Sequence, residues 1–84
     1  VIEATYLQVE AEMAARFGHL TASQAATLAR EAGVHCEFLV HISRRYSDRM
    51  ILAEAKPIFA NAIVPRDLEH YRIRRGVCEA VEQA

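Results

Sequence analysis

Cysteine, glycine and proline are scarce in this 84-residue sequence, and neither sign of charge dominates it. Its two cysteines, Cys36 and Cys78, are too few for a disulfide framework, so we expect reduced thiols in an intracellular, cytoplasmic protein. No Gly/Pro-rich linker and no internal repeat divides the chain. Ten Lys or Arg against eleven Asp or Glu give a net charge of -1, so bulk electrostatics favour neither nucleic-acid nor membrane binding.

Long apolar runs are also absent, and none approaches the roughly 20 residues of a membrane span. We therefore expect no membrane partner. Apolar residues make up 52% of the chain, which is enough for the core of one small domain. The first residues, 1–5, resemble the middle or end of a strand, so we expect that an upstream portion of the protein is missing from this chain.

Hydrophobic periodicity predicts a single α/β unit with three helices and about four short strands. The unit covers residues 1–75, and residues 76–84 form a tail without an assigned structure. We expect helices at 6–17, 22–32 and 48–59, and strands at 1–5, 36–41, 62–64 and 69–74, the last as an edge strand. A strand, a helix and a second strand in this order predict parallel pairing with a crossover connection.

The expected first helix carries an apolar stripe. Tyr6, Val9, Met13 and Phe17 recur at a spacing close to 3.6 residues, so they share one helical face. Such a stripe is typical of core packing, and we expect it to be buried.

Capping residues mark the ends of the other two helices. Thr21 and Gln24 fit a capping box, which accounts for Thr21 by structure alone. Gly33 supplies a left-handed stop, Ser47 is a candidate cap, and Pro57 should loosen the last turn of the third helix.

Three polar side chains lie at comparable junctions of the predicted fold. Glu3 is near the end of the first strand, His19 precedes the second helix, and His41 ends the central strand. In a parallel sheet these positions emerge at one edge, where Glu3 could orient His19 and favour its protonated form. Each residue also has a purely structural interpretation. Glu3 can be a solvated strand end, His19 can simply occupy a loop, and His41 can hydrogen-bond only to backbone.

The remaining titratable groups show no pattern that points to chemistry. His35 and His70 are expected to face solvent. Asp67 can cap, pair with an arginine or approach a metal, and its role stays open.

A metal centre needs more donors than this sequence offers. A catalytic zinc takes at least three protein ligands, and a neutral His41 is one good candidate. The sequence contains no His-x-His, His-Glu-x-x-His or Cys-x-x-Cys pattern. We therefore expect the chain alone to bind no metal.

Three motifs, taken together, resemble the C-terminal part of ribonuclease Z, the tRNA 3′-processing endonuclease of the metallo-β-lactamase superfamily. Glu3-Ala4-Thr5 resembles the end of a His-Glu-Ala-Thr motif, and His19-Leu20-Thr21 resembles a His-x-Thr motif. His41-Ile42-Ser43-Arg44-Arg45-Tyr46 resembles the last metal-ligand motif, His-x-Ser-x-Arg-Tyr. The resemblance extends from Val1 to about Ile73.

The resemblance implies the C-terminal half of an αββα sandwich that hydrolyses phosphodiesters of RNA, with precursor tRNA as partner. It implies a site of two zinc ions, or another divalent metal, with His41 as one ligand. Glu3 and His19 would deliver a proton to the leaving 3′-oxygen. Ser43 and Arg45 would contact either substrate phosphate or the protein itself, and the sequence does not separate these roles.

The chain departs from the family at two points. Ile2 stands where the first motif begins with His, and the His-x-His-x-Asp-His motif that precedes this region in the family is absent. The leading hypothesis is thus a segment of a zinc-dependent nuclease, inactive without its N-terminal half. The alternatives are a non-catalytic module that self-associates or binds a partner, another hydrolase of the superfamily, or a small α/β domain whose histidines have no function.

Overall fold

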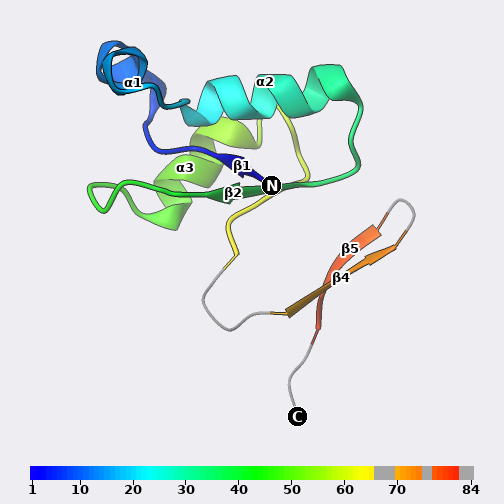
Figure 1. Ribbon diagram of the computed structural model, residues 1–84. Coiled ribbons are helices and arrows are strands. Elements are labelled where there is room, and N and C mark those ends of the chain that lie inside the picture. The colour runs from blue at the N-terminus through cyan, green and yellow to red at the C-terminus, as the bar shows by residue number, and fades with distance from the viewer. Residues whose placement is uncertain (66–69, 75–76, 82–84) are drawn as a thin grey trace.

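Three short parallel strands form the centre of the molecule (Figure 1). The computed structural model describes residues 1–65 in full and, beyond them, the backbone of two further strands. The sheet has the order β1-β2-β3, and its strands are β1 (Ile2–Glu3), β2 (Glu37–Val40) and β3 (Ala62–Ile63). Glu3 is in register with Val40, and Glu37 with Ala62. The parallel pairing expected from the sequence is confirmed.

Two helices, α2 (Ala22–Ala32) and α3 (Asp48–Ala55), pack against each other over the sheet (Figure 1). The side chains of Leu39 and Ile51 are fully buried between these layers, and each contributes about 2 kcal/mol by burial. Alanines surround them and allow close approach of the helices: Ala4, Ala22, Ala25, Ala26, Ala55 and Ala62. The core is small, and alanine makes up most of it.

Local capping signals are confirmed. The Thr21 hydroxyl accepts from the Gln24 N–H, and the Gln24 side chain accepts from the Thr21 N–H, which completes the capping box. Gly33 ends α2 with a φ of 71°, a left-handed conformation that favours glycine. Ser47 caps α3, which ends at Ala55, four residues earlier than expected, because Pro57 follows.

The first helix differs from the prediction. A 3₁₀ turn, η1 (Gln8–Glu10), precedes a shorter helix, α1 (Ala11–Phe17). The predicted burial of the apolar stripe is wrong, because Val9 is 86% exposed and Phe17 is 59% exposed. Ala14 is the only buried residue of α1. Helical periodicity identifies the apolar face, but its residues Val9 and Phe17 stay largely uncovered by the described residues.

Beyond residue 65, β4 (His70–Arg74) and β5 (Val77–Val81) form an antiparallel pair. The sequence predicted β4 as an edge strand, and it predicted no structure in 76–84, where β5 lies. The described residues therefore hold five strands rather than about four. Asp67 and the side chain of His70 lie outside what the structure describes.

One thiol also differs from the prediction. Cys36 is disulfide-bonded, so the expectation of a reduced thiol is wrong at this position. The separation of cysteines in space depends on the tertiary fold, which spacing along the sequence does not give. The side chain of Cys78 lies outside the described residues. Within the described part of the chain, no helix has the length and apolar character needed to cross a bilayer.

Candidate functional site

The site lies at the carboxyl edge of the parallel sheet, where β1 and β2 end side by side. The Ala4 N–H donates to the Val40 carbonyl at 2.9 Å, and the Ser43 N–H donates to the Thr5 carbonyl at 3.1 Å. His41 lies between these two hydrogen bonds. It is exposed and adopts a φ of 57°, a conformation rare for residues other than glycine but enriched in histidine. The chain thus turns sharply at His41 as it leaves the strand.

His19 reaches the same edge through the chain segment that follows β1. The Ala22 N–H donates to the Tyr6 carbonyl at 2.8 Å, and Tyr6 bridges to Thr21 in a parallel arrangement. Gly18 ends α1 in a left-handed conformation, and the His19 N–H then donates to the Ala14 carbonyl at 2.8 Å. The end of one helix and the start of the next therefore fix the backbone of His19.

Glu3 and His19 form the closest polar contact of the site. His19 Nδ1 lies 2.7 Å from Glu3 Oε2, and the Thr5 hydroxyl donates to the same oxygen at 2.8 Å. Because an ionised carboxylate can only accept, Nδ1 carries the hydrogen in this contact. Nε2 is then the ring nitrogen that remains to exchange a proton. The contact that the sequence predicted between these two residues is present.

The electrostatic setting keeps Glu3 ionised. The hydrogen bond from the Thr5 hydroxyl has the largest effect and lowers the pKa of Glu3 from its ordinary value. Burial opposes it, and the hydrogen bond from His19 with the electrostatic effects of His19 and His41 adds to the lowering. His41 directly follows Val40, the register partner of Glu3, so the backbone places it at the same edge as this carboxylate. The structure therefore brings together all three polar residues that the sequence placed at one edge.

Thr21 has a structural position. It is fully buried, and its hydroxyl donates to the side-chain oxygen of Gln8 at 2.9 Å while it accepts from the Gln24 N–H. Glu54 of α3 completes this cluster, because its two oxygens accept from the backbone N–H groups of Gln8 and Ser23, both at 2.8 Å. No motif in the sequence points to Gln8 or Glu54. Their partners are 13 to 46 residues away, so no local signal indicates them.

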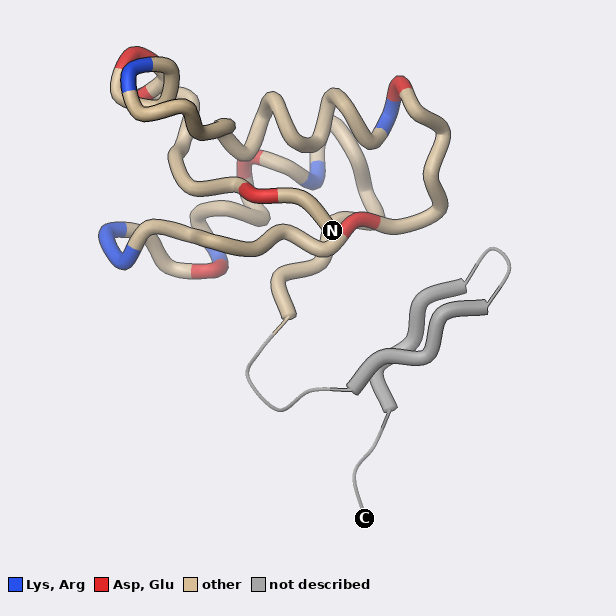
Figure 2. Tube along the Cα trace, viewed as in Figure 1, with Lys and Arg blue, Asp and Glu red and all other residues tan. Residues whose placement is uncertain are grey.

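The loop after β2, residues 41–46, holds basic residues (Figure 2). Within it, the Ser43 hydroxyl accepts from the Arg45 N–H at 3.3 Å, and the Ser43 carbonyl accepts from the Tyr46 N–H at 3.1 Å. The Arg45 guanidinium lies 2.7 Å from the carboxylate of Glu10. Both candidate substrate-binding side chains thus make contacts within the protein.

Metal ligands are few in this part of the chain. Within residues 1–65, no three His, Cys, Asp or Glu side chains gather closely enough to hold a metal ion. His35 is exposed, as the sequence predicted. His41 is a suitable single ligand, because its imidazole is exposed at the edge that carries the Glu3–His19 pair.

A carboxylate–imidazole pair at the carboxyl ends of parallel strands defines an α/β chain with a candidate acid–base site. Over most of its length this chain matches a segment of ribonuclease Z. It is 47% identical to the ribonuclease Z of Bradyrhizobium diazoefficiens over 70 residues, which are 83% of this chain and 23% of that protein. The match to the Thermobifida fusca enzyme is 53% over 68 residues, and that to the Lactococcus lactis enzyme is 43% over 76 residues.

These two matches cover 76% and 87% of the chain. The chain spans about a quarter of the length of these curated relatives. No protein-family model matches it. The chain is thus identified as a ribonuclease Z segment.

Proposed function

We propose that this chain is the C-terminal segment of a metal-dependent endoribonuclease that cleaves precursor tRNA. The observation that carries the proposal is the 2.7 Å contact between Glu3 and His19, at the sheet edge where His41 also lies. Sequence identity to ribonuclease Z over most of the chain supports the same function. In the proposed fold, the helices α2 and α3 and their sheet form one half of an αββα sandwich.

The Glu3–His19 pair acts as the general acid of the proposed reaction. Glu3 accepts from Nδ1 of His19, so it fixes the orientation of the ring and leaves Nε2 as the nitrogen that can transfer a proton. The oxygen of a water molecule bonds to phosphorus, the bond from phosphorus to the 3′-oxygen breaks, and Nε2 of His19 gives its proton to that oxygen. The proton that the attacking water loses returns through solvent to Nε2, which restores the ring. A positioned general acid accelerates such a step by about 10² to 10⁴-fold.

His41 is the residue of this chain that would hold a metal ion. A bound zinc or related ion polarises phosphoryl oxygens and lowers the pKa of water. Within residues 1–65, His41 is a single imidazole, fewer than the three protein ligands that a catalytic zinc requires, so this proposal takes the remaining donors from outside these residues. Glu3 and Thr5 stay outside the ligand set in this proposal, because they hold His19.

A chimera tests the proposed function directly. In the ribonuclease Z of Bradyrhizobium diazoefficiens, this chain replaces the segment that it matches. We expect the chimera to retain zinc, measured by elemental analysis, and to cleave precursor tRNA at the 3′ side. A folded, zinc-containing chimera without cleavage would contradict the proposal, provided that the parent enzyme is active in the same assay.

A second candidate function is a non-catalytic module that self-associates. The exposed apolar side chains of Val9 and Phe17 favour it, because an uncovered apolar face is typical of an interface. In this case the chain by itself forms a dimer in sedimentation velocity, and Val9→Ser with Phe17→Ser makes it monomeric. A monomeric parent chain would rule this function out.

A further inference from the structure

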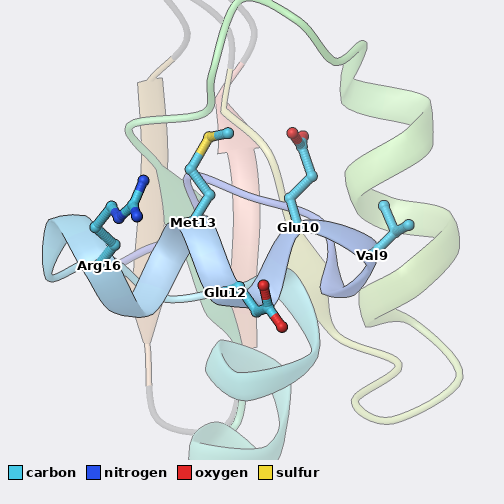
Figure 3. Close-up of a pocket in the computed structure, with 5 residues that line it drawn as sticks. All are labelled: Val9, Glu10, Glu12, Met13 and Arg16. Carbon is cyan, nitrogen blue, oxygen red and sulfur yellow. The ribbon is translucent and has the colours of Figure 1, made fainter.

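An ion pair joins loop 41–46 to the helical segment that leads to His19. Arg45 Nη1 lies 2.7 Å from Glu10 Oε2 and 3.8 Å from the sulfur of Met13. Glu10 and Met13 project from the same side of this segment, as Figure 3 shows. With Val9, Glu12 and Arg16 they border a surface pocket of about 430 Å³. The guanidinium therefore bridges two elements that are far apart in the sequence.

Packing alone attaches α1 only weakly, since Ala14 is its single buried residue. The segment nevertheless contacts both parts of the site. Glu10, immediately before the helix, contacts loop 41–46, and Ala14, in the middle of the helix, accepts from the His19 N–H. The segment from Glu10 to Ala14 thus connects the loop that begins with His41 to the backbone of His19.

The charges of this pair argue against a phosphate at Arg45. The Glu10 side chain is only 17% exposed. A carboxylate with so little access to solvent needs a positive partner. A phosphate that approached Arg45 would compete with the Glu10 carboxylate for the same guanidinium. The ion pair as a whole has no net charge, so it does not attract the phosphate. The Ser43 hydroxyl is likewise engaged, because it accepts from the Arg45 N–H.

We propose that Glu10 and Arg45 form a strut that holds His41 at a fixed place relative to the Glu3–His19 pair. In this role Arg45 is a positioning residue and does not contact substrate phosphate. Glu10 is the necessary partner of Arg45. Neither the sequence motifs nor the candidate metal ligands give Glu10 a role. The inference rests on the proposed function, because it concerns the geometry of the same site.

A double-mutant cycle in the chimera tests the strut. Glu10→Gln and Arg45→Gln are each expected to weaken zinc retention against a chelator, and to lower kcat, by about tenfold, the low end of what contacts outside the ligand set contribute. KM for precursor tRNA should stay within about twofold, since no phosphate contact is lost. The double variant should lose no more zinc retention or kcat than either single variant, because all three variants break the same contact.

The matched control is Arg44→Gln, which removes the same charge from the same loop but leaves the ion pair intact. It should not change zinc retention or kcat. Hydrogen exchange at the Ser43 amide provides a readout independent of metal and activity, and it should accelerate in both single variants but not in the control.

Opposite effects of the two single substitutions on KM would overturn the proposed strut. If Arg45 binds phosphate, Arg45→Gln raises KM, whereas Glu10→Gln frees the guanidinium and lowers KM. Additive losses in the double variant, or unchanged zinc retention in both single variants, would also overturn it. Failure of the unsubstituted chimera to cleave counts instead against the proposed function, and the exchange measurement still decides on the strut.

Discussion

The two edges of the parallel sheet carry one glutamate each, in opposite electrostatic settings. At the carboxyl edge, Glu3 accepts two side-chain hydrogen bonds on one oxygen, and its pKa is lowered. Toward the amino edge, Glu37 is 5% exposed, its Oε1 has no hydrogen-bond partner within residues 1–65, and burial raises its pKa to about 7. The two glutamates lie on the neighbouring strands β1 and β2 of one sheet.

Burial and nearby hydrogen-bond donors, and not the residue type, decide the charge of each carboxyl group. Thr5 and His19 supply donors to Glu3, so the carboxylate remains ionised and can hold an imidazole. Glu37 is buried, and within residues 1–65 its Oε1 accepts no hydrogen bond, so the neutral form is favoured and the residue costs stability when it ionises. The carboxyl edge is therefore suited to proton transfer, and the amino edge carries an energetic penalty.

The largest expected effect comes from breaking the carboxyl edge itself. In the chimera, His19→Ala should slow cleavage by about 10² to 10⁴-fold and leave the zinc content unchanged, because it removes the proton donor alone. His41→Ala should lose zinc and cleavage together, because it removes a ligand. Elemental analysis and single-turnover cleavage of precursor tRNA measure the two effects.

The two substitutions therefore discriminate between the roles. Zinc retained in His41→Ala would remove His41 from the ligand set. Equal loss of zinc and cleavage in His19→Ala would mean that His19 is a ligand or a structural residue rather than an acid.

A smaller effect is expected at the amino edge. The folded-state pKa of Glu37, about 7, lies above the ordinary value of 4.5, so the folded chain binds this proton more tightly than the unfolded chain. Stability should then fall as pH rises from 4.5 to about 7 and level off above that range. Glu37→Gln should remove this dependence and raise the free energy of unfolding at pH 8 by up to about 3 kcal/mol.

Urea denaturation at several pH values measures this dependence, and Glu12→Gln, at an exposed position on α1, is the matched control. The control should follow the parent curve. Parallel curves for the parent and Glu37→Gln would show that Glu37 ionises without cost, and the contrast between the two glutamates would fail.

The smallest effect comes from weakening one donor at the carboxyl edge. Thr5→Val removes the hydroxyl that contributes most to the lowered pKa of Glu3 and keeps the shape of the side chain. The pKa of Glu3 should rise, so the acid limb of the cleavage profile of the chimera should move to higher pH. A single hydrogen bond contributes about 1 kcal/mol, which corresponds to about a fivefold loss of kcat. An unchanged acid limb would exclude Glu3 as the group that controls it.

Short-range signals predicted the bounds of α2 and the sheet edge to which the three polar residues belong. The capping box at Thr21 spans three residues, and Gly33 and Pro57 act on the turn beside them, so the bounds of α2 could be predicted well. The placement of Glu3, His19 and His41 at one edge followed from strand order and parallel pairing alone. These inferences need no knowledge of which side chains meet in space.

Contacts across the chain were not predictable in the same way. The apolar stripe of α1 indicated burial, but Phe17 stays largely uncovered by the described residues. Glu54 and Gln8 support the start of α2 from positions that carry no motif. The pair of Glu10 and Arg45 joins segments that only the folded backbone brings together.

By itself, the sequence determined the α/β class, the bounds of α2 and the edge at which Glu3, His19 and His41 lie, because each depends on neighbours within a few residues or on strand direction. Only the tertiary structure decided which partners the charged residues have: Thr5 and His19 for Glu3, Glu10 for Arg45, and, among residues 1–65, no partner for one oxygen of Glu37. The physical reason is that hydrogen bonds and ion pairs act over about 3 Å, and that separation is set by packing of distant segments and not by spacing along the chain.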